Sequence, residues 1–172
     1  MQRKTFVQLL LPALGYMLMG NLMATVMTIS LASFALNRAV LIIASIFAAA
    51  IYLTLIAVPA YKDGVNERLA IKNKKSGEVP KFRWLGIGFV LWGVMLIPSI
   101  TYLTGNITAS VYRLIDGAVY PLSLLLTGDE LEPLFFSPFV FMGFYLLSAP
   151  ACYIGFWCGL NDKLNASKIM YK

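Results

Sequence analysis

Four long apolar stretches separated by shorter polar segments organise the chain. The stretches cover residues 5–36, 39–61, 84–103 and 134–160. Each is as long as the ~20 residues that a helix needs to cross the hydrocarbon core of a bilayer. None of them contains Asp, Glu, Lys, Arg or His. The pattern predicts an all-α polytopic membrane protein, with four transmembrane helices in a single domain over residues 1–172.

The connecting segments set how these spans follow one another. Only Asn37 and Arg38 separate the first two stretches, which predicts antiparallel neighbours. Pro12 divides a first stretch that is longer than the core is thick, so we expect the chain to turn there, with residues 3–14 along the inner surface. The loop at residues 62–83 should begin with a short helical extension capped by Asp63.

Positive charge is concentrated on one side of the predicted membrane. Of the 14 lysines and arginines, only Arg38 and Arg113 fall on the side opposite the loop at residues 62–83 and the two termini. Cytoplasmic loops carry such an excess, so we expect a cell-membrane protein with both termini in the cytoplasm. Anionic lipid headgroups on that side are the expected partners of the basic loop. The residues expected to contact them are Lys72, Lys74, Lys75, Lys81 and Arg83.

Composition agrees with this interpretation. The chain is 59% hydrophobic, with a mean hydropathy of +0.76, which excludes a soluble globular domain. Its net charge of +6 follows from the charge asymmetry across the membrane, so we expect no nucleic-acid partner.

Residues 104–133 form the outer segment, in which residues 107–127 are nearly apolar enough to span. Arg113 and Asp116 oppose a span, because each ion costs about 2.5 to 3.5 kcal/mol at the centre of a membrane helix. A fifth span would also place the C-terminal lysines outside. The sequence therefore favours an outer interfacial or re-entrant helix bent near Pro121, with a fifth span as the alternative. Polar residues recur along this segment at helical spacing: Arg113, Asp116, Tyr120, Ser123 and Thr127.

Chemistry-bearing motifs are scarce. The chain contains no histidine, which excludes catalytic triads with a His base and zinc sites built on His. Residues 63–68 partly match the metal-binding signature of the CDP-alcohol phosphotransferases. The positions that should carry further aspartates hold Ala60, Lys81 and Leu85, so no metal cluster is expected. We expect no enzyme activity, no cofactor and no metal.

Small residues recur every four positions in two of the spans. Such faces let helix backbones approach closely in lipid. They serve either packing within one bundle or docking of another subunit, and the spacing does not distinguish these uses. The candidate helix-packing residues are Gly20, Ala24 and Thr28 in the first span, and Ala151, Gly155 and Gly159 in the last.

Several short motifs carry a resemblance. They are Lys-Asp-Gly at residues 62–64, Tyr-Arg-Leu at 112–114, Tyr-Pro-Leu at 120–122, Tyr-Ile-Gly at 153–155 and the closing run at 168–172. The chain resembles small multi-pass bacterial integral membrane proteins of unassigned function. This resemblance implies a bacterial cytoplasmic membrane and carries over no activity and no site residue.

Two functions are consistent with these features. The first is a non-enzymatic accessory or assembly subunit that binds a membrane-protein partner, or further copies of itself, through the small-residue helix faces. The second is a small oligomeric transporter or channel. Its polar path would use Asn21, Arg113, Asp116, Tyr120 and Ser123. The absence of ionisable residues within the four spans argues against proton-coupled transport.

Overall fold

A computed structural model describes residues 5–31, 38–73, 82–108, 111–112, 115, 117–127 and 136–161. In these ranges every regular element is a helix. The helices are α1 (Phe6–Leu31), α2 (Arg38–Lys72), α3 (Arg83–Leu103), α5 (Tyr120–Thr127), α6 (Phe136–Leu146) and α7 (Ser148–Leu160).

Four candidate spans in the described ranges confirm the predicted fold class. Phe6–Ser30, Arg38–Lys72, Arg83–Leu103 and Pro138–Leu160 are each long and apolar enough to cross a membrane. Large apolar side chains lie exposed along them, as expected of surfaces that face lipid; Leu11 on α1, for example, is 72% exposed. The chain is therefore a multi-pass, all-α membrane protein.

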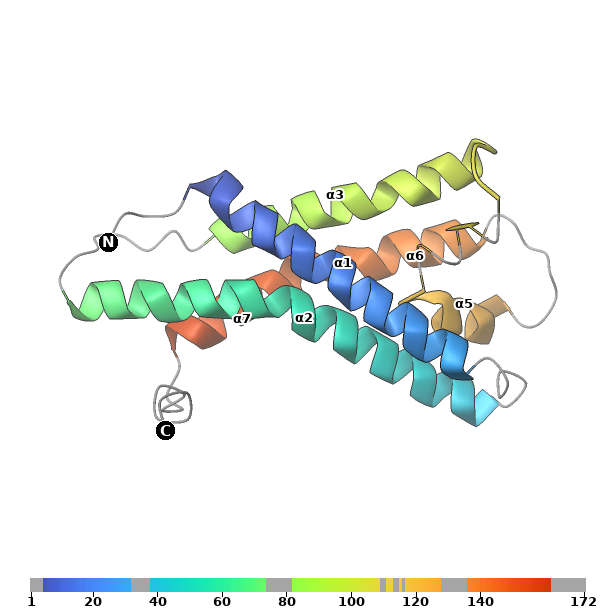
Figure 1. Ribbon diagram of the computed structural model, residues 1–172, viewed down its shortest axis with the longest axis horizontal. Helices are drawn as coiled ribbons and strands as arrows, with labels where there is room; N and C mark the ends of the chain where they lie inside the picture. Colours follow the sequence, from blue (N-terminus) through green and yellow to red (C-terminus); the bar gives the residue numbers. More distant parts are fainter. Residues whose placement is uncertain are drawn as a thin grey trace.

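The helices run side by side along the long axis of the molecule (Figure 1). α2 packs against both α1 and α7, and α3 packs against α6 and α7. The start of α1, the end of α2, the start of α3 and the end of α7 lie at one end, which we call the charged end (Figure 1). The end of α1, the start of α2 and α5 lie at the opposite end. This arrangement confirms the predicted antiparallel hairpin of the first two spans.

The predicted turn at Pro12 and the predicted cap at Asp63 are wrong. α1 continues through Pro12 without a turn, so residues 6–14 belong to the same helix as the rest of the first span. α2 continues through Pro59 as far as Lys72, so Asp63 lies inside a helix and is not a cap. Proline removes one backbone hydrogen bond, but neighbouring helices support the freed groups in membrane bundles. The loop at residues 62–83 therefore begins with about three turns of helix, which confirms the predicted helical extension.

The last span is divided at Leu147 into α6 and α7. There the backbone N–H of Leu147 bonds to Phe144 at 3.0 Å, a tighter turn than that of an α-helix. Pro150 has no N–H with which to bond the carbonyl four residues earlier, which explains the break. Trp92 on α3 donates its indole N–H to the carbonyl of Met142 at 2.9 Å and ties α6 to α3 next to this point.

Candidate functional site

Asn21, in the second half of α1, lies at the centre of a polar cluster inside the bundle. Its side chain is 8% exposed and uses both polar atoms. Nδ2 donates to the carbonyl of Ile115. Oδ1 accepts from the backbone N–H of Ala118 at 3.2 Å and from the hydroxyl of Tyr145 at 3.3 Å. One amide on α1 thus holds both the chain before α5 and a side chain of α6.

Two threonines on α1 continue this contact. Thr28 donates to the carbonyl of Gly117 at 3.1 Å. A Cβ at Gly117 would lie 2.0 Å from Oγ1 of Thr25, so only glycine fits against α1 there. Ala118 and Val119 follow and are buried in the hydrophobic core. Gly117–Val119, just before α5, therefore lie inside the bundle and are part of its interior.

This geometry decides between the alternatives for residues 107–127. Gly117–Val119 form a turn, so no continuous helix runs through this region, and α5 has only 8 residues. Neither a fifth span nor a purely interfacial helix agrees with these contacts, whereas a re-entrant segment does. Pro121 lies in the first turn of α5 and not at a bend within a helix, and its missing N–H is not needed there.

The structure brings together only part of the predicted polar site. Asn21 is in the cluster, and Tyr120 lies half-buried at the start of α5. Ser123 belongs to α5, but its side chain lies outside the described residues, as do Arg113 and Asp116. Asn21 is engaged by the protein's own groups. Its described contacts are those of a residue that positions the re-entrant segment.

Other polar groups in the core are paired across helices. The hydroxyl of Tyr52 on α2 lies 3.2 Å from that of Ser148 at the start of α7. The hydroxyl of Ser99 on α3 lies 3.1 Å from that of Tyr112. Tyr52 also meets the ring of Tyr145 edge to face, at 5.2 Å between centroids. These contacts link the helices to one another at depth in the bundle.

The small-residue faces serve the interior of this same bundle. A Cβ on Gly159 would lie 2.2 Å from the carbonyl oxygen of Tyr61, and one on Gly155 would lie 2.7 Å from that of Ala57. Gly64 on α2 is equally close to α7; it follows Ala60 by four residues, a small-residue spacing that could have identified it. The α2 and α7 backbones therefore touch along two turns.

The remaining candidate packing residues also face other parts of the chain. Gly20 faces the backbone of Tyr52, Ala24 is fully buried, and Thr28 holds Gly117. Ala151 is half-buried and packs against the core. Packing within one bundle was one of the two predicted uses of these faces, and it accounts for each of these contacts.

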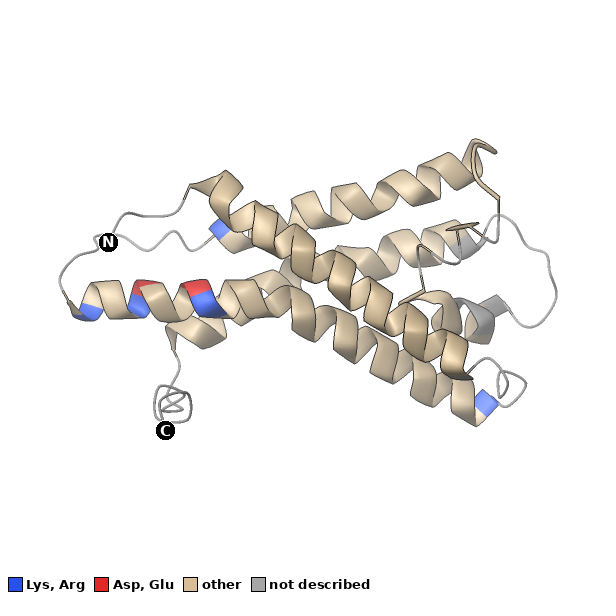
Figure 2. Cartoon of the chain, in the orientation of Figure 1, with Lys and Arg blue, Asp and Glu red and all other residues tan. Residues whose placement is uncertain are grey.

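Four residues form an inner charge cluster at the charged end: Asp63, Glu67, Arg83 and Trp84. Nη2 of Arg83 bonds to Asp63 and lies 3.4 Å from Glu67. The indole of Trp84 donates to Asp63 at 2.8 Å. Both carboxylates are only 7% exposed. Figure 2 shows that the acidic positions of the described chain lie on the part of α2 at the charged end.

The cluster changes the interpretation of the basic loop. Arg83 binds the chain's own carboxylates, a role that the sequence analysis did not assign. Lys72 is exposed at the end of α2, and Lys74, Lys75 and Lys81 lie outside the described residues. Two acids four residues apart, with an arginine at the start of the next span, were the available signal. In the described ranges, no group of three or more His, Cys, Asp or Glu side chains could hold a metal ion.

Comparison with known proteins identifies no relative. No protein-family model, curated protein or solved structure matches this chain.

Proposed function

We propose that this protein is a non-enzymatic accessory or assembly subunit of a bacterial cytoplasmic membrane, with both termini in the cytoplasm. The observation that carries the proposal is the use of its buried polar side chains. Asn21, Tyr52, Ser99 and the inner charge cluster all bond to other parts of the same chain. These described side chains are engaged by the protein itself, which supports a rigid scaffold and not a site that transfers protons to a substrate.

A scaffold needs a surface for its partner, and the face of α3 that points away from the bundle supplies a candidate. Gly86 and Gly93 are exposed there, and a Cβ on either would meet no atom within 4 Å. Val90 and Ile97 are exposed on the same stripe. Outward glycines in lipid permit close approach of a second helix, which supports docking on α3 and not on the internal faces of α1 and α7.

The test is capture of the complex from native membranes with Gly86→Leu and Gly93→Leu combined. Both positions face away from the bundle, so the larger side chains should not disturb the fold. They should prevent a helix of the partner from approaching α3 closely. Gly15→Leu is the matched control, because Gly15 is an exposed glycine of α1 with no atom within 4 Å of its Cβ position.

We expect a mild detergent extract of the wild-type and control proteins to contain a larger assembly, and the double variant to lose it. A strictly monomeric wild-type protein without a co-purifying chain would contradict the proposal. Loss of the assembly in the Gly15 variant alone would contradict the choice of α3.

The second candidate is a small oligomeric transporter or channel with a polar path near Arg113 and Asp116. The re-entrant segment and the broken last span favour it, because irregular backbone at membrane depth is frequent around transport sites. The test is flux through reconstituted protein. Unchanged flux in Arg113→Ala and Asp116→Ala would remove this candidate.

A further inference from the structure

A lysine and a tyrosine meet where α1 and α2 cross. Nζ of Lys62 lies 3.3 Å from the hydroxyl oxygen of Tyr16 and donates to it. The same ammonium lies 5.7 Å from the centre of the Tyr16 ring. Lys62 is exposed and Tyr16 is half-buried. Because the tyrosine oxygen accepts this bond, its own O–H remains able to donate to a further group.

Lys62 keeps its positive charge uncompensated in the described part of the chain. Successive residues of an α-helix point about 100° apart, so Asp63 and Glu67 lie on a different face of α2 from Lys62. Both acids turn inward and meet Arg83. The inner charge cluster therefore removes the nearby carboxylates from the surface and leaves Lys62 facing outward without a carboxylate partner among the described residues.

The position of Lys62 along α2 places it at the level of lipid headgroups. It is the first charged residue of α2 after Arg38, 24 positions earlier in the sequence. At ~1.5 Å per residue the two cations are roughly 36 Å apart along the helix, slightly more than the ~30 Å hydrocarbon core. Each cation thus lies just outside the core, at the depth of the headgroup phosphates.

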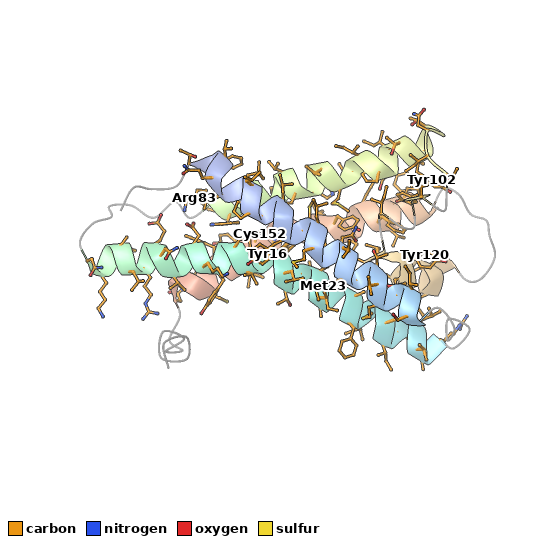
Figure 3. The ribbon with its side chains drawn as sticks, viewed as in Figure 1. Tyr16, Met23, Arg83, Tyr102, Tyr120 and Cys152 are labelled. Atoms are coloured by element: carbon orange, nitrogen blue, oxygen red, sulfur yellow. The ribbon has the colours of Figure 1, made fainter. Side chains whose placement is uncertain are left out.

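An apolar surface continues from this pair towards the middle of the membrane. Met19 and Met23 follow Tyr16 at helical spacing on α1 and are 57% and 47% exposed. Tyr16 and Met23 lie along α1 where it crosses α2 (Figure 3). Methionine is flexible and polarizable, which suits a surface that packs against a mobile acyl chain.

We propose that Tyr16 and Lys62 form a binding site for an anionic phospholipid. The ammonium and the phenol O–H both donate to the headgroup phosphate, and Met19 and Met23 contact the first part of an acyl chain. Two donors from two helices distinguish this site from general attraction of a basic surface for anionic lipid. The site does not depend on the assembly function proposed above.

The test is native mass spectrometry of the full-length protein, with phosphatidylglycerol or phosphatidylcholine of identical acyl chains added to the detergent solution. The variants are Tyr16→Phe, which keeps the ring and removes only the hydroxyl, and Lys62→Gln. Lys72→Gln is the control, because Lys72 is an exposed lysine of the same helix. Each site variant should weaken binding of the first phosphatidylglycerol about fivefold. The control should leave this binding unchanged.

Two results would overturn the proposal. One is equal binding of phosphatidylglycerol and phosphatidylcholine to the wild-type protein. The other is a combination: Lys72→Gln weakens phosphatidylglycerol binding as much as Lys62→Gln does, and Tyr16→Phe leaves this binding unchanged. General attraction between the basic surface and anionic lipid would then explain the binding. Tyr16→Phe retains its packing and keeps the test decisive if Lys62→Gln does not fold.

Discussion

Replacing Asn21 with alanine tests whether the re-entrant segment is held inside the bundle. The substitution removes three hydrogen bonds at once and leaves the Ile115 carbonyl, the Ala118 N–H and the Tyr145 hydroxyl without this partner. Hydrogen bonds between membrane helices average about 0.6 kcal/mol and reach about 1.7 kcal/mol. Asn21 is only 8% exposed, so water has little access to take over these hydrogen bonds in the variant. We expect a loss of about 2 to 4 kcal/mol in the free energy of unfolding.

The assay is reversible unfolding in mixed micelles of mild detergent and SDS, followed by tryptophan fluorescence. Hydrogen–deuterium exchange of residues 111–127 supplies a local readout, since a released segment should exchange faster than in the wild-type protein. Asn106→Ala is the matched control, because Asn106 is exposed and bonds only locally to Thr104. A change below about 0.5 kcal/mol with unaltered exchange would refute the role given to Asn21.

Two further predictions concern helix contacts and buried charge. Gly159→Ala should destabilise the protein by about 1 to 3 kcal/mol in the same unfolding assay, because its Cβ would lie 2.2 Å from the carbonyl oxygen of Tyr61. Gly143→Ala, at a position with no atom within 4 Å, should not destabilise it, and equal losses would disprove the close α2–α7 contact. Arg83→Gln should cost about 3 to 5 kcal/mol by removing the arginine that pairs with the buried carboxylate of Asp63. If so, adding Asp63→Asn should recover part of the loss, and strictly additive effects would contradict direct pairing.

The number of spans could be predicted because its signal is local. Runs of about 20 residues without charge have few uses other than crossing a bilayer. The course of the helices was harder to predict, since Pro12 looks like an interruption in the sequence. In the structure both α1 and α2 continue through a proline, as membrane helices can when other groups satisfy the freed backbone. Asp63 was interpreted as a cap, but it lies inside α2.

The contacts of the candidate site could be predicted only in part. Asn21 was recognisable as a polar residue in an apolar span, but its partners lie 94 to 124 residues later in the chain. Two of these partner groups belong to the backbone, and a backbone group carries no sequence signal. The repeats around Gly155 and Gly159 indicated close approach without naming the helix approached. Gly117 stands outside any repeat, so its contact with α1 became visible only in the fold.

Membrane topology tests the central claim of a four-span bundle with a re-entrant segment. Single cysteines at Lys72, Asn106 and Asn161, in a protein with Cys152→Ala and Cys158→Ser, would be labelled with an impermeant maleimide in intact cells. The structure and the charge asymmetry predict labelling at Asn106, and labelling at Lys72 and Asn161 only after the membrane is permeabilised. Labelling of both Asn106 and Asn161 in intact cells, with Lys72 protected, would contradict the account. Lys72 and Asn161 would then lie on opposite sides of the membrane, whereas the two spans between them place both on the same side.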